Sequence, residues 1–297
     1  STSVAASAPR MSARGPVLDA PVGAAARESA GDRAAIEVRG LTMRYGSLLI
    51  MADLDFAVAR GEVFVIMGGS GSGKSTLLKH LIGLKKAAEG SILFDGRDFG
   101  EADETSRKGM LRRMGVLYQN GALWSGLTLA ENVALPIEEF TGLPAESIAQ
   151  LVSLKLALVG LRGFEGYYPV EISGGMRKRA ALARAVAMDP EMLFFDEPSS
   201  GLDPITASRL DDLILQLRDS LGPTIVVVSH DLDSIFKIAD RAVFLDIKEK
   251  TMTALGDPAE LRDDPPSEEV REFLTRGGDV GVRAVAGGTP ERSAVTR

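Results

Sequence analysis

The segment EVFVIM-GGSGSGKS-TLLKHLIGL, residues 62–84, decides the fold of this chain. Glu62–Met67 is almost wholly apolar, which predicts a buried strand, and the residues from Thr76 onward place leucine and isoleucine at helical spacing. Between them, Gly68–Ser75 matches the pattern G-x-x-x-x-G-K-[ST]. Because strand, motif and helix follow in register, the segment indicates a phosphate-binding loop rather than a Gly/Ser turn with an incidental lysine.

This loop predicts a site for a nucleoside triphosphate. Its glycines let successive backbone N–H groups curl around phosphate oxygens at the start of a helix, where negative charge is favoured. Lys74 is expected to reach the β and γ phosphates, and the Ser75 hydroxyl to ligate Mg²⁺. The nucleotide-binding residues expected here are Gly68, Gly69, Ser70, Gly71, Ser72, Gly73, Lys74, Ser75 and Thr76.

Further apolar runs predict more buried strands, and helical patterns lie between them. The runs are Met192–Phe195, Thr224–Val228 and Ala242–Ile247. Alternation of strands and helices predicts an α/β fold with a mainly parallel sheet. Ligands of such sheets lie beyond the carboxyl ends of the strands, so we expect the phosphate loop, Asp196–Glu197 and Ser229–His230 to converge.

The two carboxylates that follow the strand MLFF are predicted to have different tasks. Adjacent residues of a strand point in different directions. We expect Asp196 to hold Mg²⁺ through water, and Glu197 to orient or deprotonate the attacking water near the γ-phosphate. A pair of acidic helix caps is the alternative, and the phosphate loop favours the catalytic interpretation. Glu directly after the magnesium aspartate favours water over another phosphate acceptor.

The two histidines of the chain receive opposite predictions. His230 follows a very apolar strand, where it can donate to the γ-phosphate or hold Glu197 and the water in place; a structural histidine is the alternative. His80 lies off the Leu77/Leu78/Leu81/Ile82 stripe of the helix after the phosphate loop, so we expect it to face solvent.

Composition excludes several classes of protein and site. The 297 residues include 41 acidic and 34 basic side chains, with a pI of about 5.1, so a nucleic-acid site would have to be local. The absence of cysteine removes disulfides and thiolate metal sites and suits a reducing cytoplasm. Two histidines exclude a histidine-rich metal site. No apolar run approaches the roughly 20 residues that span a membrane.

The pattern along the chain predicts tails around one large domain. Residues 1–34 and 279–297 are predicted to be disordered because of their Gly/Ala/Ser-rich composition. The domain is expected over 35–256, with a helical subdomain at about 120–185 because helical spacing dominates Thr128–Leu161. A C-terminal helical extension is expected over 257–278, capped by Ser267, with Glu268 and Glu269 in its first turn and an apolar stripe of Val270, Phe273 and Leu274.

The order of these motifs resembles that of an ATP-binding cassette (ABC) transporter ATPase over about Ile36–Leu274. The elements in family order are the aromatic A-loop at Tyr45, Walker A at Gly68–Ser75, the Q-loop at Gln119, the signature ISGGM at Ile172–Met176, Walker B ending in Asp196–Glu197, the D-loop SGLD at Ser200–Asp203, and the switch His230. The resemblance implies a P-loop NTPase core with a RecA-like mixed sheet flanked by helices, an antiparallel β subdomain and an inserted helical subdomain. Ile172 and Met176 depart from the commonest signature, which has Leu and Gln there.

The resemblance also implies roles for residues that the motifs alone do not explain. Tyr45 would stack on adenine, with a packed core aromatic as the alternative, and Gln119 would touch Mg²⁺ and report the γ-phosphate. Ser173, Gly174 and Gly175 would contact the γ-phosphate bound to the opposite subunit, since such cassettes close head-to-tail over two ATP molecules. Asp203 would couple the two sites. Catalysis would rest on Glu197, His230, Gln119 and Lys74, and the metal would be held by Ser75, Gln119 and Asp196.

Two stretches, residues 118–144 and 173–207, are similar to the ATPase of bacterial Mla-type systems, which move phospholipids between the inner and outer membranes. That resemblance implies an integral-membrane permease, a lipid-binding mammalian-cell-entry (MCE) protein and possibly a small accessory subunit, with the ATPase peripheral on the cytoplasmic face of the inner membrane. Trp124 would meet the permease, with burial in a helical core as the alternative. Competing functions are a polar-solute importer ATPase, a soluble nucleic-acid-maintenance ATPase and a P-loop kinase.

Four basic residues follow the signature, and they do not require a nucleic-acid partner. Arg177, Lys178, Arg179 and Arg184 are expected on a helix that starts at Ser173–Gly175. We expect them to maintain positive potential near the triphosphate and to pair with acidic neighbours, with simple solvation of Arg179 and Arg184 as the alternative.

Overall fold

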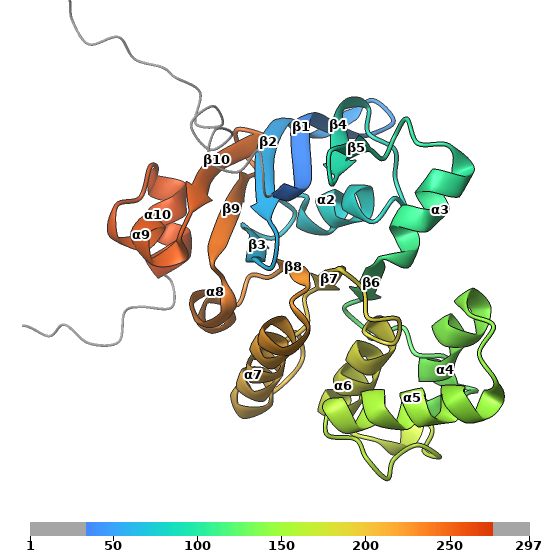
Figure 1. Cartoon of the computed structure of the whole chain (residues 1–297). Coiled ribbons are helices and arrows are strands. Elements are labelled where there is room, and N and C mark those ends of the chain that lie inside the picture. The colour runs from blue at the N-terminus through green and yellow to red at the C-terminus, as the bar shows by residue number, and fades with distance from the viewer. Residues whose placement is uncertain (1–33, 276–297) are drawn as a thin grey trace, which may run out of the picture.

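The computed structural model describes residues 34–275, whose strands form two sheets (Figure 1). The central sheet has the strand order β10-β9-β3-β8-β7-β6, in which all neighbours are parallel except β10 and β9. Its strands are β3 (Val63–Met67), β6 (Met114–Leu117), β7 (Met192–Asp196), β8 (Thr224–Val228), β9 (Arg241–Asp246) and β10 (Thr251–Gly256). The predicted α/β fold with a mainly parallel sheet is therefore confirmed.

The second sheet is antiparallel and has the order β2-β1-β4-β5. Its strands are β1 (Ala34–Tyr45), β2 (Leu48–Ala59), β4 (Glu89–Phe94) and β5 (Arg97–Asp98). Figure 1 shows helix α2 (Lys74–Leu81) between this sheet and the central one. The antiparallel sheet thus covers the helix that follows the phosphate loop.

The remaining helices lie around the other edges and face of the central sheet (Figure 1). They are α3 (Glu104–Arg112), α4 (Leu129–Phe140), α5 (Ala145–Leu158), α6 (Gly174–Ala185), α7 (Pro204–Leu221), α8 (Leu232–Ile238), α9 (Pro258–Asp263) and α10 (Glu268–Thr275), with a 3₁₀ turn at Pro169–Glu171. Helices α4, α5 and α6 pack on one another and form a group beyond the β6 edge. Among residues 34–275, no helix combines the length and the apolar character that crossing a bilayer requires.

Strand β3 explains why the sequence around the phosphate loop is so apolar. Val63, Val65 and Met67 belong to the core shared with the helices α4 to α8 and α10. Phe64 and Ile66 belong to the core shared with α2 and the antiparallel sheet. A strand covered on both faces needs apolar side chains at every position, because neither face meets water. The rigid strand then delivers the phosphate loop at its carboxyl end.

His80 contradicts the prediction made for it, because it is buried. It is 1% exposed, and its Nδ1 lies 2.8 Å from the carbonyl oxygen of Thr76. Burial lowers the pKa of the imidazole. The solvent-facing prediction assumed that α2 buries one stripe, whereas the helix is enclosed between two sheets and buries more of its circumference.

The C-terminal helix α10 has the capping and burial predicted from its sequence. The Ser267 hydroxyl accepts a hydrogen bond from the Val270 N–H at 3.3 Å. Val270, Phe273 and Leu274 are buried, and the Phe273 ring meets that of Phe244 on β9 edge-on, with centroids 5.3 Å apart. Apolar packing therefore attaches α10 to the central sheet. The predicted tails, 1–34 and 279–297, and the end of the predicted extension lie outside the described residues, except for Ala34.

Candidate functional site

The phosphate loop requires glycine at the points where the backbone turns. Gly68 has φ 144°, and a Cβ added there would lie 2.6 Å from the carbonyl oxygen of Leu245. Gly73, the N-cap of α2, has φ 87°, and a Cβ there would lie 2.9 Å from Ile50 Cγ2. Both positions combine a conformation that side chains disfavour with a neighbour that leaves no room. The loop is therefore shaped by packing against β9 and β2.

Lys74 points back into the loop that precedes it. Its Nζ donates to the carbonyl oxygens of Gly68 and Gly69 at 3.0 and 2.9 Å. Burial lowers the pKa of this ammonium, while the nearby carboxylates of Glu197 and Asp196 oppose that shift. Its hydrogen bonds go to neutral carbonyls, and no carboxylate of the described residues forms an ion pair with it, so this buried cation favours an anionic ligand in the loop.

Ser75 and Asp196 meet although they are far apart in sequence. Ser75 Oγ, at the start of α2, donates to Asp196 Oδ1, at the end of β7, at 2.9 Å. A hydroxyl and a carboxylate are oxygen ligands of the kind that Mg²⁺ takes, together with phosphate oxygens and water. These two side chains fit a magnesium site beside the phosphate loop.

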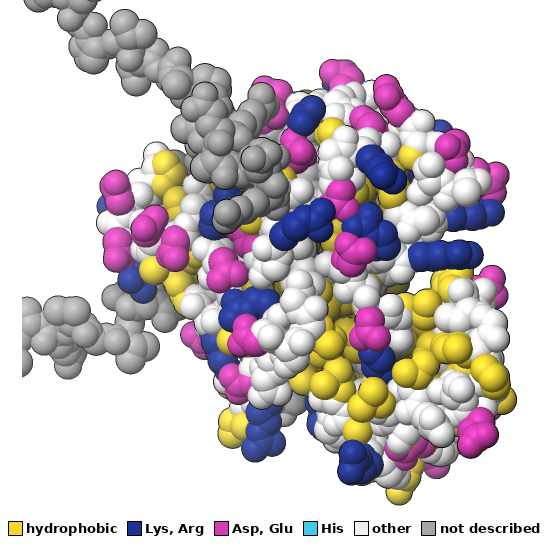
Figure 2. All heavy atoms as spheres, viewed as in Figure 1, with side chains coloured by type: hydrophobic (Ala, Val, Ile, Leu, Met, Phe, Trp, Pro, Cys, Tyr) yellow, Lys and Arg dark blue, Asp and Glu magenta, His cyan; other side chains and the backbone are white. Residues whose placement is uncertain are grey.

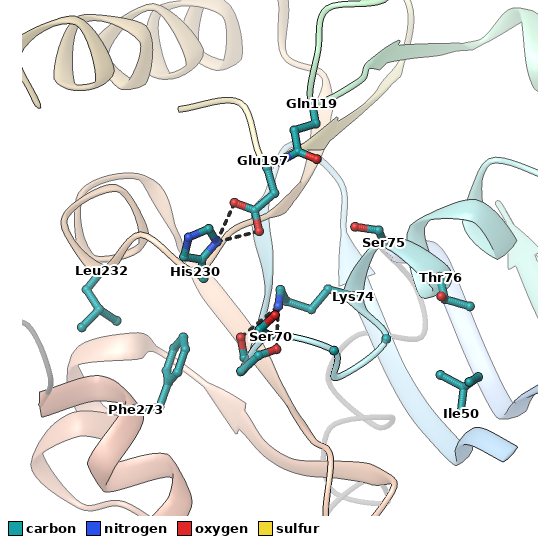
Figure 3. Close-up of a pocket in the computed structure, with 14 residues that line it drawn as sticks. Ile50, Ser70, Lys74, Ser75, Thr76, Gln119, Glu197, His230, Leu232 and Phe273 are labelled. Atoms are coloured by element: carbon teal, nitrogen blue, oxygen red, sulfur yellow. Dashed lines mark hydrogen bonds and ion pairs between the residues drawn. The ribbon is translucent and has the colours of Figure 1, made fainter. Parts of the chain in front are cut away.

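Glu197 faces His230 across the mouth of the loop (Figure 3). A Glu197 carboxylate oxygen lies 2.7 Å from His230 Nδ1. The Glu197 backbone is in the left-handed region, with φ 50°, and its N–H donates to the carbonyl oxygen of Val228 at 2.9 Å. A non-glycine residue in this conformation is strained, and such strain is concentrated at functional sites. The bend turns Glu197 away from Asp196 and toward the pocket.

Gln119 lies at the edge of the pocket, between β6 and α4. Its side-chain Nε2 donates to Ser200 Oγ at 3.3 Å. The backbone carbonyl oxygen of Gln119 accepts a hydrogen bond from Lys178 Nζ. Lys178 also donates to the carbonyl oxygen of Glu197, at 3.2 Å. One buried lysine of α6 therefore holds the Gln119 and Glu197 segments together.

These groups surround one cavity of about 670 Å³ (Figure 3). Its lining residues are Ile50, Gly68, Gly69, Ser70, Gly71, Gly73, Lys74, Ser75, Thr76, Gln119, Glu197, His230, Leu232 and Phe273. Ser72 does not line the cavity, but its Oγ is buried and has no hydrogen-bond partner among the described residues. An orphaned hydroxyl, a crowded glycine cradle and a buried ammonium fit a triphosphate in this loop.

Three lining residues were not found from the sequence. Ile50 comes from β2, Leu232 from the start of α8 and Phe273 from α10, and they supply apolar surface around the polar groups (Figure 3). Phe273 had a detectable signal, since it belongs to the predicted apolar stripe of the C-terminal helix. That the stripe would lie beside the phosphate loop depends on the tertiary fold.

Tyr45 is close to the cavity but does not line it. The tyrosine is 43% exposed, which is inconsistent with a packed core aromatic. Lys85 Nζ lies 3.3 Å from the centroid of the Tyr45 ring. Hydrogen bonding to Thr76, which lines the cavity, and to Lys85 lowers the pKa of the Tyr45 phenol. The residue predicted to stack on adenine therefore stands beside the phosphate loop.

The signature and D-loop residues lie elsewhere in the chain. Ser173 is the N-cap of α6, where its Oγ accepts from the Met176 N–H at 3.2 Å, and Gly174 begins the helix. Asp203 is the N-cap of α7, accepting from Thr206 N and Oγ1 at 3.0 and 2.6 Å, which lowers the pKa of its carboxyl. Ser173 and Gly175 line a second hollow, which does not include the phosphate loop.

Within residues 34–275, the arginines of α6 form no ion pair with an acidic neighbour, and they are not simply solvated. Arg177 donates to the carbonyl oxygens of Pro169 and Ile172, Arg179 to those of Val159 and Gly160, and Arg184 to those of Gly121 and Ala122. The predictions of pairing with acidic residues and of simple solvation are therefore both wrong for the arginines. Lys178 does lie near the carboxylates of Glu197 and Asp196, and the positive potential expected near the triphosphate stays a prediction. The backbone carbonyl groups that the arginines contact lie outside the β-strands and α-helices and need hydrogen-bond donors. Each guanidinium group supplies donors and so attaches its segment to α6.

Trp124 is 66% exposed, which excludes the alternative that it forms part of a helical core. The backbone N–H of Trp124 donates to Asn132 Oδ1 at 2.8 Å, so the loop that presents the ring is fixed by a buried side chain of α4. The indole borders a groove that also includes Tyr118, Phe140 and Met188. Figure 2 shows hydrophobic side chains gathered over the α4 and α5 part of the molecule.

Comparison with known proteins identifies the chain's relatives. Residues 51–200 match the ABC transporter family. The chain is 42% identical to the intermembrane phospholipid transport system ATP-binding protein MlaF of Haemophilus influenzae over 250 residues, 84% of this chain and 93% of the relative. It is 41% identical to MlaF of Escherichia coli K12 over 239 residues, which are 80% of this chain and 88% of that relative. It is also 41% identical to the probable ribonucleotide transport ATP-binding protein mkl of Mycobacterium tuberculosis H37Rv over 249 residues, which are 83% of this chain and 68% of that relative.

Solved structures of ATP-binding cassettes share the fold. The dimeric post-hydrolysis structure of the cassette MJ0796 bound to ADP and phosphate has a TM-score of 0.68 and 27% identity, covering 75% of this chain and 98% of that one. The cassette cbiO1 of Clostridium perfringens has a TM-score of 0.72 and 27% identity, with 82% and 95% coverage. The antiparallel sheet, the mixed central sheet and the helices around it agree with the fold expected from the motifs. The chain belongs to the ABC transporter family, as an ATPase subunit.

Proposed function

We propose that this chain hydrolyses ATP to power phospholipid transport between the inner and outer membranes, together with an integral-membrane permease and an MCE-domain partner. The observation that carries the proposal is the assembled pocket with Glu197 and His230 2.7 Å apart at the phosphate loop. The similarity to two MlaF proteins over 88–93% of their lengths supports phospholipid as the cargo.

In this proposal the pocket binds ATP and places water for attack. The backbone of Gly68–Thr76 and the Lys74 ammonium bind the phosphates. Tyr45, beside Thr76 at the edge of the cavity, stacks on the base. Ser75, Asp196 and Gln119 would hold Mg²⁺, which supplies charge neutralisation for the phosphates when bound. Glu197 accepts the proton of the attacking water, and His230 holds that carboxylate in place.

We propose that a second copy completes the site. Ser173, Gly174 and Gly175 present the exposed N-terminus of α6 to solvent, away from the phosphate loop of their own chain. Two copies arranged head-to-tail would place this N-terminus on the partner's γ-phosphate and bring Asp203 between the two sites. The dimeric cassette MJ0796 is a precedent in a related protein.

The other partners follow from the same proposal. The nucleotide-binding domain is 35–256, and the helical part, about 120–185, carries the groove at Trp124 on which the permease would dock. An exposed aromatic presented by a fixed loop is the kind of anchor that dominates interfaces. The chain would then lie peripherally on the cytoplasmic face of a bacterial inner membrane, with a small accessory subunit as a further possible partner. The helical extension is proposed over 257–278, and its described part carries α9 and α10.

A second candidate is transport of a polar solute such as a ribonucleotide. The chain is as similar to mkl as to MlaF of E. coli, at 41% identity in both cases, and the similarity to mkl favours this candidate. The match to mkl covers only 68% of that protein, however, against 93% of MlaF from H. influenzae. The larger share of MlaF that the alignment covers therefore favours phospholipid as the transported substrate.

The experiment that separates the two candidates is purification of the tagged full chain from its native membranes with its partner proteins. The purified complex is reconstituted in liposomes, and its ATPase rate is measured with added phospholipid or ribonucleotide. We expect an MCE-domain protein and a permease to co-purify, and phospholipid to stimulate hydrolysis. A soluble substrate-binding protein in the complex, with stimulation by ribonucleotide, would overturn the assignment. The Glu197→Gln variant, which should lose stimulation by either, is the control.

A further inference from the structure

The side chain of His230 is exposed, so few contacts of its own hold it in position. It is 63% exposed, and the hydrogen bond to Glu197 is its polar contact within residues 34–275. Its placement therefore depends on its neighbours in sequence. Ser229 is anchored because its N–H donates to the carbonyl oxygen of Ile66 on β3 at 3.2 Å. The other neighbour, Asp231, is anchored through side chains.

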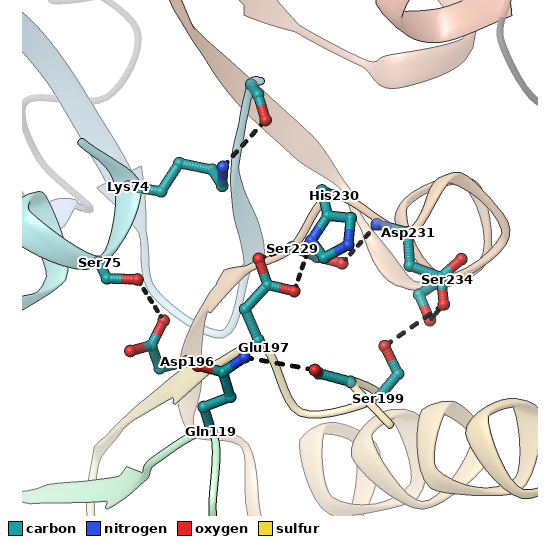
Figure 4. A network of polar contacts seen from close by, with 12 residues as sticks. Lys74, Ser75, Gln119, Asp196, Glu197, Ser199, Ser229, His230, Asp231 and Ser234 are labelled. Atoms are coloured by element: carbon teal, nitrogen blue, oxygen red, sulfur yellow. Dashed lines mark hydrogen bonds and ion pairs between the residues drawn. The ribbon is translucent and has the colours of Figure 1, made fainter. Parts of the chain in front are cut away.

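Asp231 links the His230 segment to two other parts of the site (Figure 4). Its Oδ2 accepts from Ser199 Oγ at 3.3 Å, and Ser199 lies two residues beyond Glu197. The same Oδ2 lies 3.4 Å from Ser234 Oγ in the first turn of α8. Asp231 therefore joins the segment that carries His230 to the segment that carries Glu197.

The network continues to a buried carboxyl group on α7. Ser234 Oγ lies 3.0 and 2.9 Å from the two carboxyl oxygens of Asp211, which is 3% exposed. Ser234 has one hydroxyl hydrogen and three carboxyl oxygens within reach, two from Asp211 and one from Asp231. It cannot donate to both carboxylates at once. A proton on Asp211 resolves this shortage, because Asp211 then donates to Ser234, and Ser234 donates to Asp231.

The surroundings of Asp211 favour that proton below about pH 6. Burial raises the pKa of the Asp211 carboxyl to about 6, and the charges of Asp231 and Asp212 act in the same direction. The Ser234 hydroxyl and the Lys237 ammonium oppose the shift. Lys237 is itself engaged, with Nζ 2.7 Å from Asp212 Oδ1 and from the carbonyl oxygen of Ser208. Asp211 therefore has no cation within hydrogen-bonding distance among the described residues.

We propose that Asp211 is a positioning residue for the Glu197–His230 pair and acts through Ser234 and Asp231. Asp203 is the N-cap of helix α7, so the same helix connects the D-loop to the segment that carries His230. Asp211 does not line the cavity at the phosphate loop. It fixes the first turn of α8 and thereby the direction from which His230 meets Glu197. This inference rests on the proposed roles of Glu197 and His230 in hydrolysis.

The test compares ATPase kinetics of the full chain carrying Ser234→Ala, Asp211→Val or Asp211→Asn. We expect Ser234→Ala and Asp211→Val each to lower kcat about tenfold, with KM for ATP changed less than twofold. The double variant should be no worse than either single one, because both changes break one chain of contacts. Asp211→Asn keeps a donor for Ser234, so it should restore kcat to within about threefold and abolish any inflection of kcat near pH 6.

Asp212→Asn is the matched control, since Asp212 is the next residue of α7 and is largely exposed. It should leave kcat unchanged. The inference is overturned if Ser234→Ala retains wild-type kcat, or if Asp211→Asn loses as much kcat as Asp211→Val. If Asp211→Val does not fold, Ser234→Ala still decides. Normal hydrolysis by Glu197→Gln would instead refute the proposed function, whatever the Ser234 and Asp211 variants do.

Discussion

The phosphate-loop pocket and the signature segment are both at helix N-termini, yet one chain completes only the first. At α2, Lys74, Ser75 and Glu197 are tied to other elements by hydrogen bonds, and apolar residues from three elements enclose the cavity. At α6, the hydrogen bond of the Ser173 hydroxyl is to the first turn of its own helix, at the Met176 N–H. Helix geometry alone therefore does not make a nucleotide site, since converging side chains are also needed. This difference is why we propose that a second copy supplies them.

The largest effect should come from breaking the complete pocket. Glu197→Gln removes the proposed base while keeping the shape of the side chain, so we expect ATP binding to persist and kcat to fall by about 10²–10⁴. Equilibrium ATP binding and steady-state hydrolysis measure the two effects, and the dimer should accumulate with ATP bound. Glu104→Gln, at an exposed glutamate of α3, is the control and should be neutral. Hydrolysis near the wild-type rate would remove Glu197 from the mechanism.

The next effect tests whether the signature segment serves another chain's pocket. Ser173→Arg and Lys74→Ala should each be nearly inactive alone. In a mixture, a dimer of one copy of each has one intact pocket facing one intact signature. About a quarter of wild-type activity should therefore return, since half of the dimers are mixed and each has one working site. ATPase rate against mixing ratio is the measurement. Full activity of Ser173→Arg alone would show that the pockets work independently.

A smaller effect is expected at the groove of Trp124, which is part of neither the phosphate-loop pocket nor the signature segment. Trp124→Ala should leave the ATPase rate of the isolated chain within about twofold, because the indole is not part of the pocket. Binding to the permease should weaken about tenfold, as for loss of an aromatic anchor. Co-purification yield and stimulated ATPase rate report this. Lost hydrolysis in the isolated chain would assign Trp124 to folding instead.

The smallest effect concerns Asp211 and the pH dependence of the free energy of unfolding. The raised pKa of Asp211 means that the folded state binds this proton more tightly than the unfolded state, so the stabilisation is present near pH 4 and lost as pH rises through about 6. Asp211→Asn removes the cost of the buried charge. Its free energy of unfolding should exceed that of the wild type by up to about 3 kcal/mol at pH 7.5 and by less at pH 5. Urea unfolding at both pH values measures this, and a pH-independent difference would contradict it.

The sequence predicted the parts of the site that lie at strand ends. The apolar runs before Gly68, Asp196 and Ser229 indicated strands, and the rule that parallel strands end at one edge brought their polar residues together. The same reasoning failed for His80, because a helical stripe shows one buried face and does not reveal a second layer above the helix. It also failed for Arg179 and Arg184, since no local pattern reveals which distant carbonyls lack partners.

The sequence by itself determined which groups make up the candidate site: a phosphate loop, two carboxylates at a strand end and a histidine, in the order of one family. These are local signals, because glycine conformations and strand-end polarity are properties of short segments. The tertiary structure alone decided that Phe273 and Ile50 enclose the pocket, that Lys178 joins the Gln119 and Glu197 segments, and that Asp211 meets Ser234. Such contacts join residues far apart in the chain, and only the packing of helices on the sheet brings them within hydrogen-bonding distance.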